Sequence, residues 1–126
     1  EAEEILAETL DVIRHPDFAP LFGPGSLAEV PLTGVLKASD GVYTLSGQVD
    51  RLLIADDAVT VIDFKTNRPP PESEDQIAPA YLRQMAAYRA VLRSIYPGRP
   101  VRAVLLWTVG PKMMLLGDEI LDIHAP

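Results

Sequence analysis

The sequence contains no cysteine among its 126 residues. This absence excludes disulfide bonds, zinc–thiolate sites and cysteine nucleophiles. No long uncharged apolar run is present either, so no segment is expected to span a membrane. A Gly-rich phosphate loop, a nucleotide-binding fingerprint and an ordered Ser, His and Asp set are also missing. Candidate chemistry must therefore come from carboxylates, lysine and other polar side chains.

Positive charge is also scarce, with 11 basic against 18 acidic residues and a formal net charge of −7. DNA binders usually carry a basic face, so this balance argues against an autonomous DNA-binding module. A hydrolase that collects carboxylates around Mg²⁺ is an exception, because the metal supplies part of the positive charge. The length suits one globular domain. The chain opens on EAEEILAETL without an initiator Met, so we expect it to be part of a longer protein.

Hydrophobic periodicity predicts an α/β chain. Apolar residues at helical spacing predict a helix over residues 2–14, which His15-Pro16 ends. A first strand, interrupted by Pro31 and Gly34, is expected after an irregular loop. Together with the two strands that follow it, the predicted strands cover residues 27–37, 42–55 and 58–66.

The second half of the chain predicts a βαβ unit. A polar, proline-rich loop over residues 67–78 precedes a helix over 79–96, which Pro97-Gly98 ends. Residues 101–109 are a nearly continuous apolar run, as expected of a strand buried on both faces. Strand 58–66, the helix and strand 101–109 should form one crossover with parallel strands. The tail from Pro111 onward is short, and its pattern predicts no particular element.

A two-residue turn at Asp56-Asp57 would bring charged side chains together. In that register Asp50 faces Asp63 and Gln48 faces Lys65, and directly opposed residues project from the same face. Two carboxylates about 5 Å apart repel each other by about 3 kcal/mol at an effective dielectric of about 20. Either one carboxylate is protonated or a cation lies between them. Two carboxylates with waters and phosphate oxygens are ligands that Mg²⁺ prefers.

Plainer structural explanations exist for each of these residues. Asp50, Asp63 and Lys65 could form a salt-bridge cluster on an exposed sheet face, and a slip of one residue would break the pairing. Against this alternative, the charges interrupt an otherwise strongly β-forming segment, VTVIDFKT. Gln84 and Tyr88 share a helix face, where they either pack in the core or point at the charged end of the hairpin.

Three further residues carry less weight in the sequence. Glu29 on the first strand could join the carboxylate site. His15 and His124 flank loop or tail positions and are expected to be ordinary surface histidines.

The segments GQVDRL (47–52), IDFKT (62–66) and QMAAYR (84–89) carry a family resemblance. Their order, G-x-x-D, then D-x-K, then Q-x-x-x-Y on the next helix, resembles the RecB-like branch of the PD-(D/E)XK nuclease superfamily. The wider text, from AEVPLTG to AVLLWT, is similar to the C-terminal nuclease domain of bacterial AddA-type helicase–nucleases of double-strand break repair. Each motif alone is weak, whereas the three in order at this spacing are specific.

The resemblance implies a restriction-endonuclease-like core, a mixed β-sheet flanked by helices, over residues 1–126 as one domain. It implies Mg²⁺-dependent cleavage of unwound DNA, with Mn²⁺ as a possible substitute and ATP needed only by helicase domains outside this chain. It also implies an AddB-type partner subunit and a bacterial, cytoplasmic and nucleoid-associated setting. The implied site consists of Asp50, Asp63 and the Phe64 carbonyl as metal ligands, Lys65 as the catalytic lysine, and Gln84 and Tyr88 as accessory residues.

One departure from the family pattern concerns a histidine. This branch also uses a metal-binding histidine in a Gly-x-x-x-His-like setting on a helix upstream of the first strand. His15 lies in HPDFAPLF, which does not match that motif, so the role is not transferred to it. We expect the histidine to lie upstream, and the isolated chain to bind Mg²⁺ or Mn²⁺ weakly and cut DNA poorly.

Two rival functions are also compatible with the sequence. A catalytically silent scaffold could hold DNA or a partner subunit, but it would have no need for a repelling carboxylate pair. A metal hydrolase acting on another substrate could use a similar hairpin, but no small-molecule pocket signature supports it.

Overall fold

The computed structural model describes residues 26–38, 41–66, 70–108 and 112–125. The helix expected over residues 2–14 and His15 lie outside the described residues. Five strands form one mixed sheet in the order β1-β2-β3-β4-β5. All neighbours pair antiparallel except β3 and β4, which are parallel as predicted. The strands are β1 Ser26–Ala38, β2 Gly41–Ile54, β3 Val59–Lys65, β4 Val101–Trp107 and β5 Lys112–Leu115.

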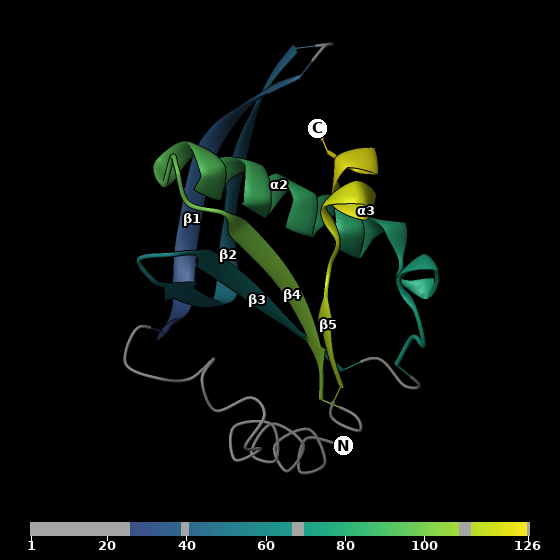
Figure 1. Ribbon diagram of the computed structural model, residues 1–126. Coiled ribbons are helices and arrows are strands. Elements are labelled where there is room, and N and C mark those ends of the chain that lie inside the picture. The colour runs from purple at the N-terminus through teal and green to yellow at the C-terminus, as the bar shows by residue number, and fades with distance from the viewer. Residues whose placement is uncertain (1–25, 39–40, 67–69, 109–111, 126) are drawn as a thin grey trace.

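Helix α2, Pro79–Ile95, connects β3 to β4 and crosses one face of the sheet (Figure 1). Pro79 stands in its first turn, where a missing N–H costs nothing, and Pro97-Gly98 follows its end, so the predicted helix is confirmed. A short 3₁₀ helix, Glu74–Gln76, lies in the loop before it. Among the described residues, none of the helices has the length and apolarity that crossing a bilayer requires.

The central strands β3 and β4 are buried on both faces of the sheet. Alternate residues of a strand point to opposite sides, and Val61 and Leu105 pack with Met85 and Leu92 of α2 in the main core. Ile62, Val104 and Leu106 form a second buried cluster. Strand β4 is therefore apolar because it is buried on both faces, as the sequence predicted.

Strand β1 continues through the two residues that were expected to interrupt it. Pro31 is accommodated because β1 is an edge strand, where an N–H can be lost without breaking a ladder. Gly34 is required by packing, since a Cβ there would lie 2.8 Å from Cγ1 of Val91 on α2. Strand β1 is therefore not interrupted. Pro31 reflects its place at the edge of the sheet, and Gly34 reflects its close contact with α2.

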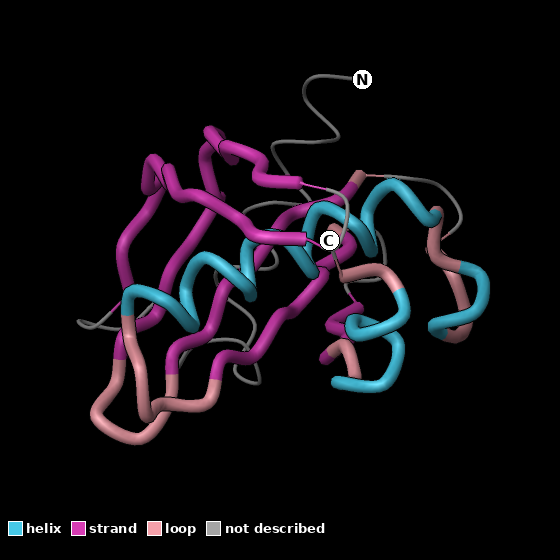
Figure 2. Tube along the Cα trace, turned by 90° about the horizontal axis from the view of Figure 1, so that it is seen from above, coloured by secondary structure: helices cyan, strands magenta, loops and turns pink. Residues whose placement is uncertain are grey.

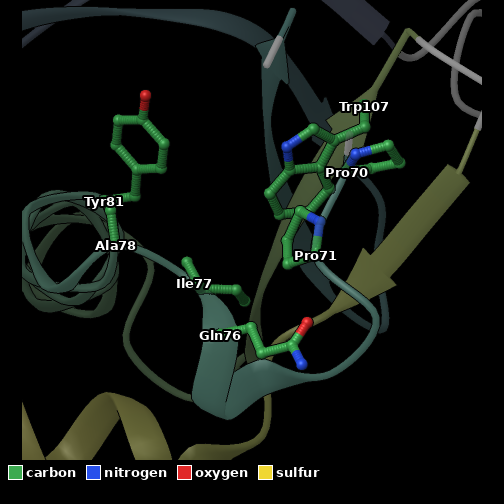
Figure 3. Close-up of a pocket in the computed structure, with 7 residues that line it drawn as sticks. All are labelled: Pro70, Pro71, Gln76, Ile77, Ala78, Tyr81 and Trp107. Atoms are coloured by element: carbon green, nitrogen blue, oxygen red, sulfur yellow. The ribbon is translucent and has the colours of Figure 1, made fainter. Parts of the chain in front are cut away.

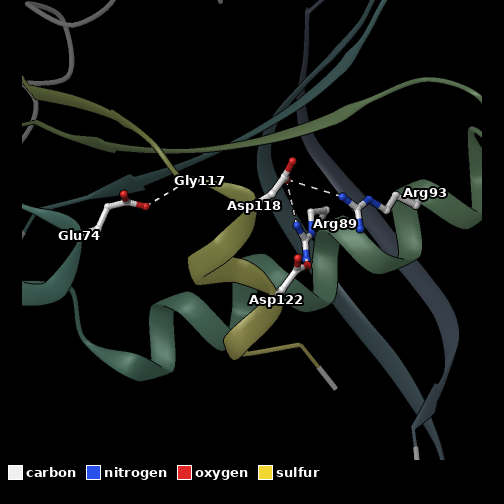
Figure 4. Close-up of polar contacts among 6 residues, drawn as sticks. All are labelled: Glu74, Arg89, Arg93, Gly117, Asp118 and Asp122. Carbon is white, nitrogen blue, oxygen red and sulfur yellow. Dashed lines mark hydrogen bonds and ion pairs between the residues drawn. The ribbon is translucent and has the colours of Figure 1, made fainter.

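The tail from Pro111 onward adds elements that the sequence did not predict. After β5, helix α3 spans Asp118–Ile123 and lies beside α2, as Figure 2 shows from above. The buried Arg89 of α2 binds α3 through two ion pairs, with Nη1 3.0 Å from Asp118 Oδ1 and Nη2 2.5 Å from Asp122 Oδ1 (Figure 4). The Gly117 N–H before α3 also donates to Glu74 Oε2 at 2.9 Å.

Candidate metal centre

The β2–β3 hairpin places the candidate site. Asp56 and Asp57 form the turn, and the Ala55 N–H donates to the Ala58 carbonyl at 2.9 Å. The predicted register is confirmed along the ladder from Ile54–Val59 to Arg51–Ile62. Beyond that last pair the backbone ladder stops, so the opposition of Asp50 and Asp63 is not a ladder pair.

A side chain takes over where the ladder ends. Hydrogen-bonded pairs alternate along an antiparallel ladder, so with Ala55 and Ala58 bonded, Val49 and Phe64 would be bonded in a continued ladder. The Phe64 N–H instead donates to Asp50 Oδ2 at 2.7 Å. The Asp50 carboxylate thereby substitutes for a strand carbonyl and is held directly beside the residue that follows Asp63.

Asp63 is the buried member of the carboxylate pair. It is 7% exposed, because β3 runs under α2 at this point. Burial, reinforced by a hydrogen bond to Asp50, raises the pKa of Asp63 to about 6, against the opposing effect of Lys65. The Lys65 Nζ lies 2.5 Å from Asp63 Oδ2. Two carboxylates and one ammonium thus meet at the end of β3, as the hairpin predicted.

The Lys65 ammonium is held from a second side by an aromatic ring. Its Nζ lies 3.9 Å from the ring centroid of Tyr81, in the first turn of α2. A cation over a tyrosine face is attracted by the ring quadrupole. The contact of Tyr81 with Lys65 depends on how α2 crosses β3.

Of the two residues considered together on this helix face, Tyr88 packs in the core, whereas Gln84 is exposed. Tyr88 is buried in the core, and Gln84 Nε2 donates to its hydroxyl at 3.3 Å. Burial raises the pKa of Tyr88, and the charges of Asp63 and Asp50 add to that rise. The hydroxyl therefore lies within the electrostatic field of the carboxylate pair.

Gly47, the glycine of the G-x-x-D motif, had no structural role assigned to it from the sequence. A Cβ at this position would lie 3.1 Å from the Tyr88 hydroxyl oxygen. The absent side chain thus lets Tyr88 approach β2 three residues before Asp50. The only sequence signal was the glycine of the GQVDRL segment.

Glu29 lies on β1 across from Asp50. The β1–β2 register pairs Ala28 with Arg51 and Val30 with Val49, and the position between them is not paired. Glu29 is exposed and has a left-handed backbone, φ 51°, which is uncommon for a residue with a side chain. Within the described ranges, no third His, Asp or Glu joins Asp50 and Asp63 in a group that could hold a metal ion.

The remaining histidine of the described chain has a local role. His124 Nδ1 lies 3.0 Å from the Ile120 carbonyl oxygen, within α3 and its end. It takes no part in the carboxylate cluster, in keeping with the expectation from sequence.

The donor set at the end of β3 fits a hard divalent cation. Asp50 and Asp63 offer carboxylate oxygens, the ligands that Mg²⁺ prefers. The raised pKa of Asp63 means that one ammonium does not compensate for burial and the second carboxylate. A cation between the two carboxylates would remove that deficit.

Two of three comparisons with known proteins find a match for this chain. The model of the PD-(D/E)XK nuclease superfamily matches residues 2–114. The chain is also similar to the crystal structure of SSO0001, with a TM-score of 0.53 and 14% identity, over 96% of this chain and 64% of that one. The present chain thus spans less than two thirds of that protein, and the likeness concerns the fold alone. A comparison with curated proteins finds no match. With the mixed sheet and its helices, these results confirm the restriction-endonuclease-like α/β fold.

Proposed function

Because the chain belongs to the PD-(D/E)XK nuclease superfamily, we propose that it is a metal-dependent DNA nuclease domain that hydrolyses phosphodiester bonds. The observation that carries this proposal is the cluster at the end of β3. There the buried Asp63 meets the Asp50 carboxylate and the Lys65 ammonium, and its pKa is raised to about 6. If β3 served only as a structural strand, burying two carboxylates with a single ammonium would not stabilise the fold.

The residues of the cluster have distinct proposed roles. Asp50 and Asp63 would hold Mg²⁺ or Mn²⁺, with the Phe64 carbonyl oxygen as a further ligand, and the ion when bound supplies positive charge for the phosphate oxygens. Lys65 stabilises the negative charge that develops on the phosphate and orients the attacking water. Its ammonium is held for that task between Asp63 and the Tyr81 ring.

Gln84 and Tyr88 are proposed as accessory residues. Their mutual hydrogen bond and the seat of Tyr88 against Gly47 hold the tyrosine hydroxyl at the edge of the cluster. From there they would support the carboxylates and contact the DNA backbone. Glu29, exposed across from Asp50, is a weaker candidate for the same site.

We further propose that this domain acts in a bacterial AddA-type helicase–nuclease for double-strand break repair and recombination. The order of the three motifs, G-x-x-D, D-x-K and Q-x-x-x-Y, supports this narrower assignment. An AddB-type subunit would be its partner, and ATP would serve the helicase domains of the same protein. The single nuclease domain would degrade strands that those domains unwind, in the bacterial cytoplasm.

The proposal is tested by DNA degradation in the complete helicase–nuclease with its partner subunit. End-labelled linear duplex DNA is incubated with ATP and Mg²⁺, and unwinding and cleavage are measured separately. We expect Asp63→Asn to lower cleavage by at least about 100-fold, since it removes a metal ligand, and to leave unwinding unchanged. Asp57→Asn, an exposed carboxylate in the turn of the same hairpin, is the matched control and should cleave as wild type does.

Two outcomes would contradict the proposal. Undiminished cleavage by Asp63→Asn would remove the assigned site. A wild-type complex that binds and unwinds DNA but does not cut it in Mg²⁺ or Mn²⁺ would instead support the catalytically silent scaffold.

A further inference from the structure

A pocket of about 280 Å³ lies beside the carboxylate cluster. Its walls come from the loop before α2, the first turn of α2 and the end of β4. Figure 3 shows Tyr81 on one side of the space and Trp107 with two prolines on the other. The lining residues are Pro70, Pro71, Gln76, Ile77, Ala78, Tyr81 and Trp107.

The pocket is next to Lys65 on the same face of the sheet. In the parallel β3–β4 ladder Lys65 is directly paired with Trp107, and Asp63 with Leu105. Lys65 also contacts the ring of Tyr81, whose side chain lines the pocket. A group inside the pocket would therefore be separated from the Lys65 ammonium by little more than one aromatic ring.

One wall of this pocket, Trp107, carries a polar group that has no partner among the described residues. Trp107 is 1% exposed, and its indole Nε1 has no hydrogen-bond acceptor within the part of the chain that the structure describes. Buried N–H groups are nearly always paired, so an unpaired one indicates that a partner is missing. In Figure 3 the nitrogen-bearing edge of Trp107 turns toward the space between it and Tyr81.

We propose that this pocket holds one unpaired nucleobase of a single-stranded nucleic acid, beside the phosphate at Lys65. The ring of Tyr81 and the surfaces of Pro70 and Pro71 suit the face of a base, as in proteins that bind single strands without sequence preference. The Trp107 indole N–H would donate to a ring nitrogen or carbonyl oxygen on the edge of the base. A base paired and stacked within a duplex could not enter, so the pocket selects unpaired strands.

This inference rests on the proposed nuclease function and specifies its substrate. The nucleotide whose base lies in the pocket would be the one next to the phosphate at Lys65. Such a contact is useful because the net charge of −7 repels the phosphate backbone of DNA. A stacked base adds affinity that does not depend on a basic surface.

Trp107 is the only tryptophan of the chain and reports directly on the pocket. The test follows its fluorescence in EDTA during titration with a single-stranded oligonucleotide. The control strand has the same length and backbone charge, but every nucleotide is abasic. We expect the base-containing strand to quench and shift the Trp107 emission, and the abasic strand to leave it unchanged.

A substitution that fills the pocket adds a second arm. Ala78→Phe should weaken binding of the base-containing strand by roughly 5- to 150-fold, the range that one stacked base provides. Binding of the abasic strand should not change. Ala80→Phe is the matched control, because Ala80 is also exposed at the start of α2 but does not line the pocket. Thermal unfolding checks that both variants are folded.

The outcomes separate this inference from the nuclease proposal. Equal responses to the two strands, or no change in Trp107 emission at any attainable concentration, would overturn the nucleobase pocket, and the wild-type protein suffices for that measurement. Cleavage in Mg²⁺ that depends on Asp63 would still uphold the nuclease function in that case. Emission changes specific to bases, together with no cleavage by the complete helicase–nuclease, would uphold the pocket and refute the nuclease.

Discussion

Replacing Asp63 with asparagine should change how stability depends on pH in the absence of metal. The pKa of this buried carboxyl is raised from 3.8 to about 6 in the fold. The folded state therefore holds the proton more tightly than the unfolded state does. The resulting stabilisation is fully present below about pH 4 and is lost as pH rises through about pH 6. A difference of roughly 2 pH units corresponds to about 3 kcal/mol at 1.36 kcal/mol per unit.

The assay is urea unfolding of wild type and Asp63→Asn in EDTA, at several values between about pH 4 and pH 7. We expect the unfolding free energy of wild type, relative to the variant, to fall by about 2–2.5 kcal/mol across this range, because the unfolded carboxyl is already partly ionised at pH 4. Asparagine also leaves Lys65 without its anionic partner at every pH of the series, so this loss changes the size of the free-energy difference and not its slope with pH. Asp57→Asn, in the exposed turn, should show no comparable slope.

A relative free energy that stays constant across this pH range would refute the reasoning. It would mean that Asp63 is solvated in the fold as it is in the unfolded chain. Added Mg²⁺ offers a second measure at about pH 7, because a cation that binds only the ionised, folded site stabilises it by mass action. Wild type should gain stability from Mg²⁺, and Asp63→Asn should not.

Two packing predictions concern α2, each measured by urea unfolding. Gly34→Ala should lower the free energy of unfolding by about 1–3 kcal/mol, because its Cβ would lie 2.8 Å from Val91 Cγ1. In the double variant with Val91→Ala, the loss should be smaller than the sum of the two single losses. Strictly additive losses would contradict this contact. The double substitution Asp118→Asn and Asp122→Asn should cost on the order of 3 kcal/mol, since it leaves the buried Arg89 guanidinium without a counter-charge. Arg89→Met should cost less, because both carboxylates are largely exposed and remain hydrated; the reverse order would show that Arg89 acts mainly through packing.

The local part of the site was predictable from the sequence. A two-residue turn and alternating apolar residues determine a hairpin register, since a slip of one residue would move every apolar side chain to the wrong face. That register brought Asp50, Asp63 and Lys65 to one end of one face. The helix bounds and the parallel pairing of β3 with β4 followed from proline, glycine and the apolar run in β4.

The elements missed were those whose signals are not local. Helix α3 is short, and its place beside α2 depends on Arg89, a residue that reads in the sequence as one more surface charge of a helix. The end of the β2–β3 ladder was also unpredictable. It depends on the Asp50 carboxylate accepting the Phe64 N–H, a competition between side chain and backbone that no spacing reveals.

The sequence by itself determined which charged groups share a strand face and in what order the elements follow. Tertiary structure alone decided the chemistry of those groups. The raised pKa of Asp63, the ring of Tyr81 against Lys65 and the unpaired indole of Trp107 all arise where α2 and β4 close over the end of β3. Desolvation sums over atoms from distant segments, whereas periodicity and turn residues act over a few neighbours. For that reason the sequence could locate the carboxylates. Only the packed fold could show that the Lys65 ammonium does not compensate for their burial and mutual repulsion.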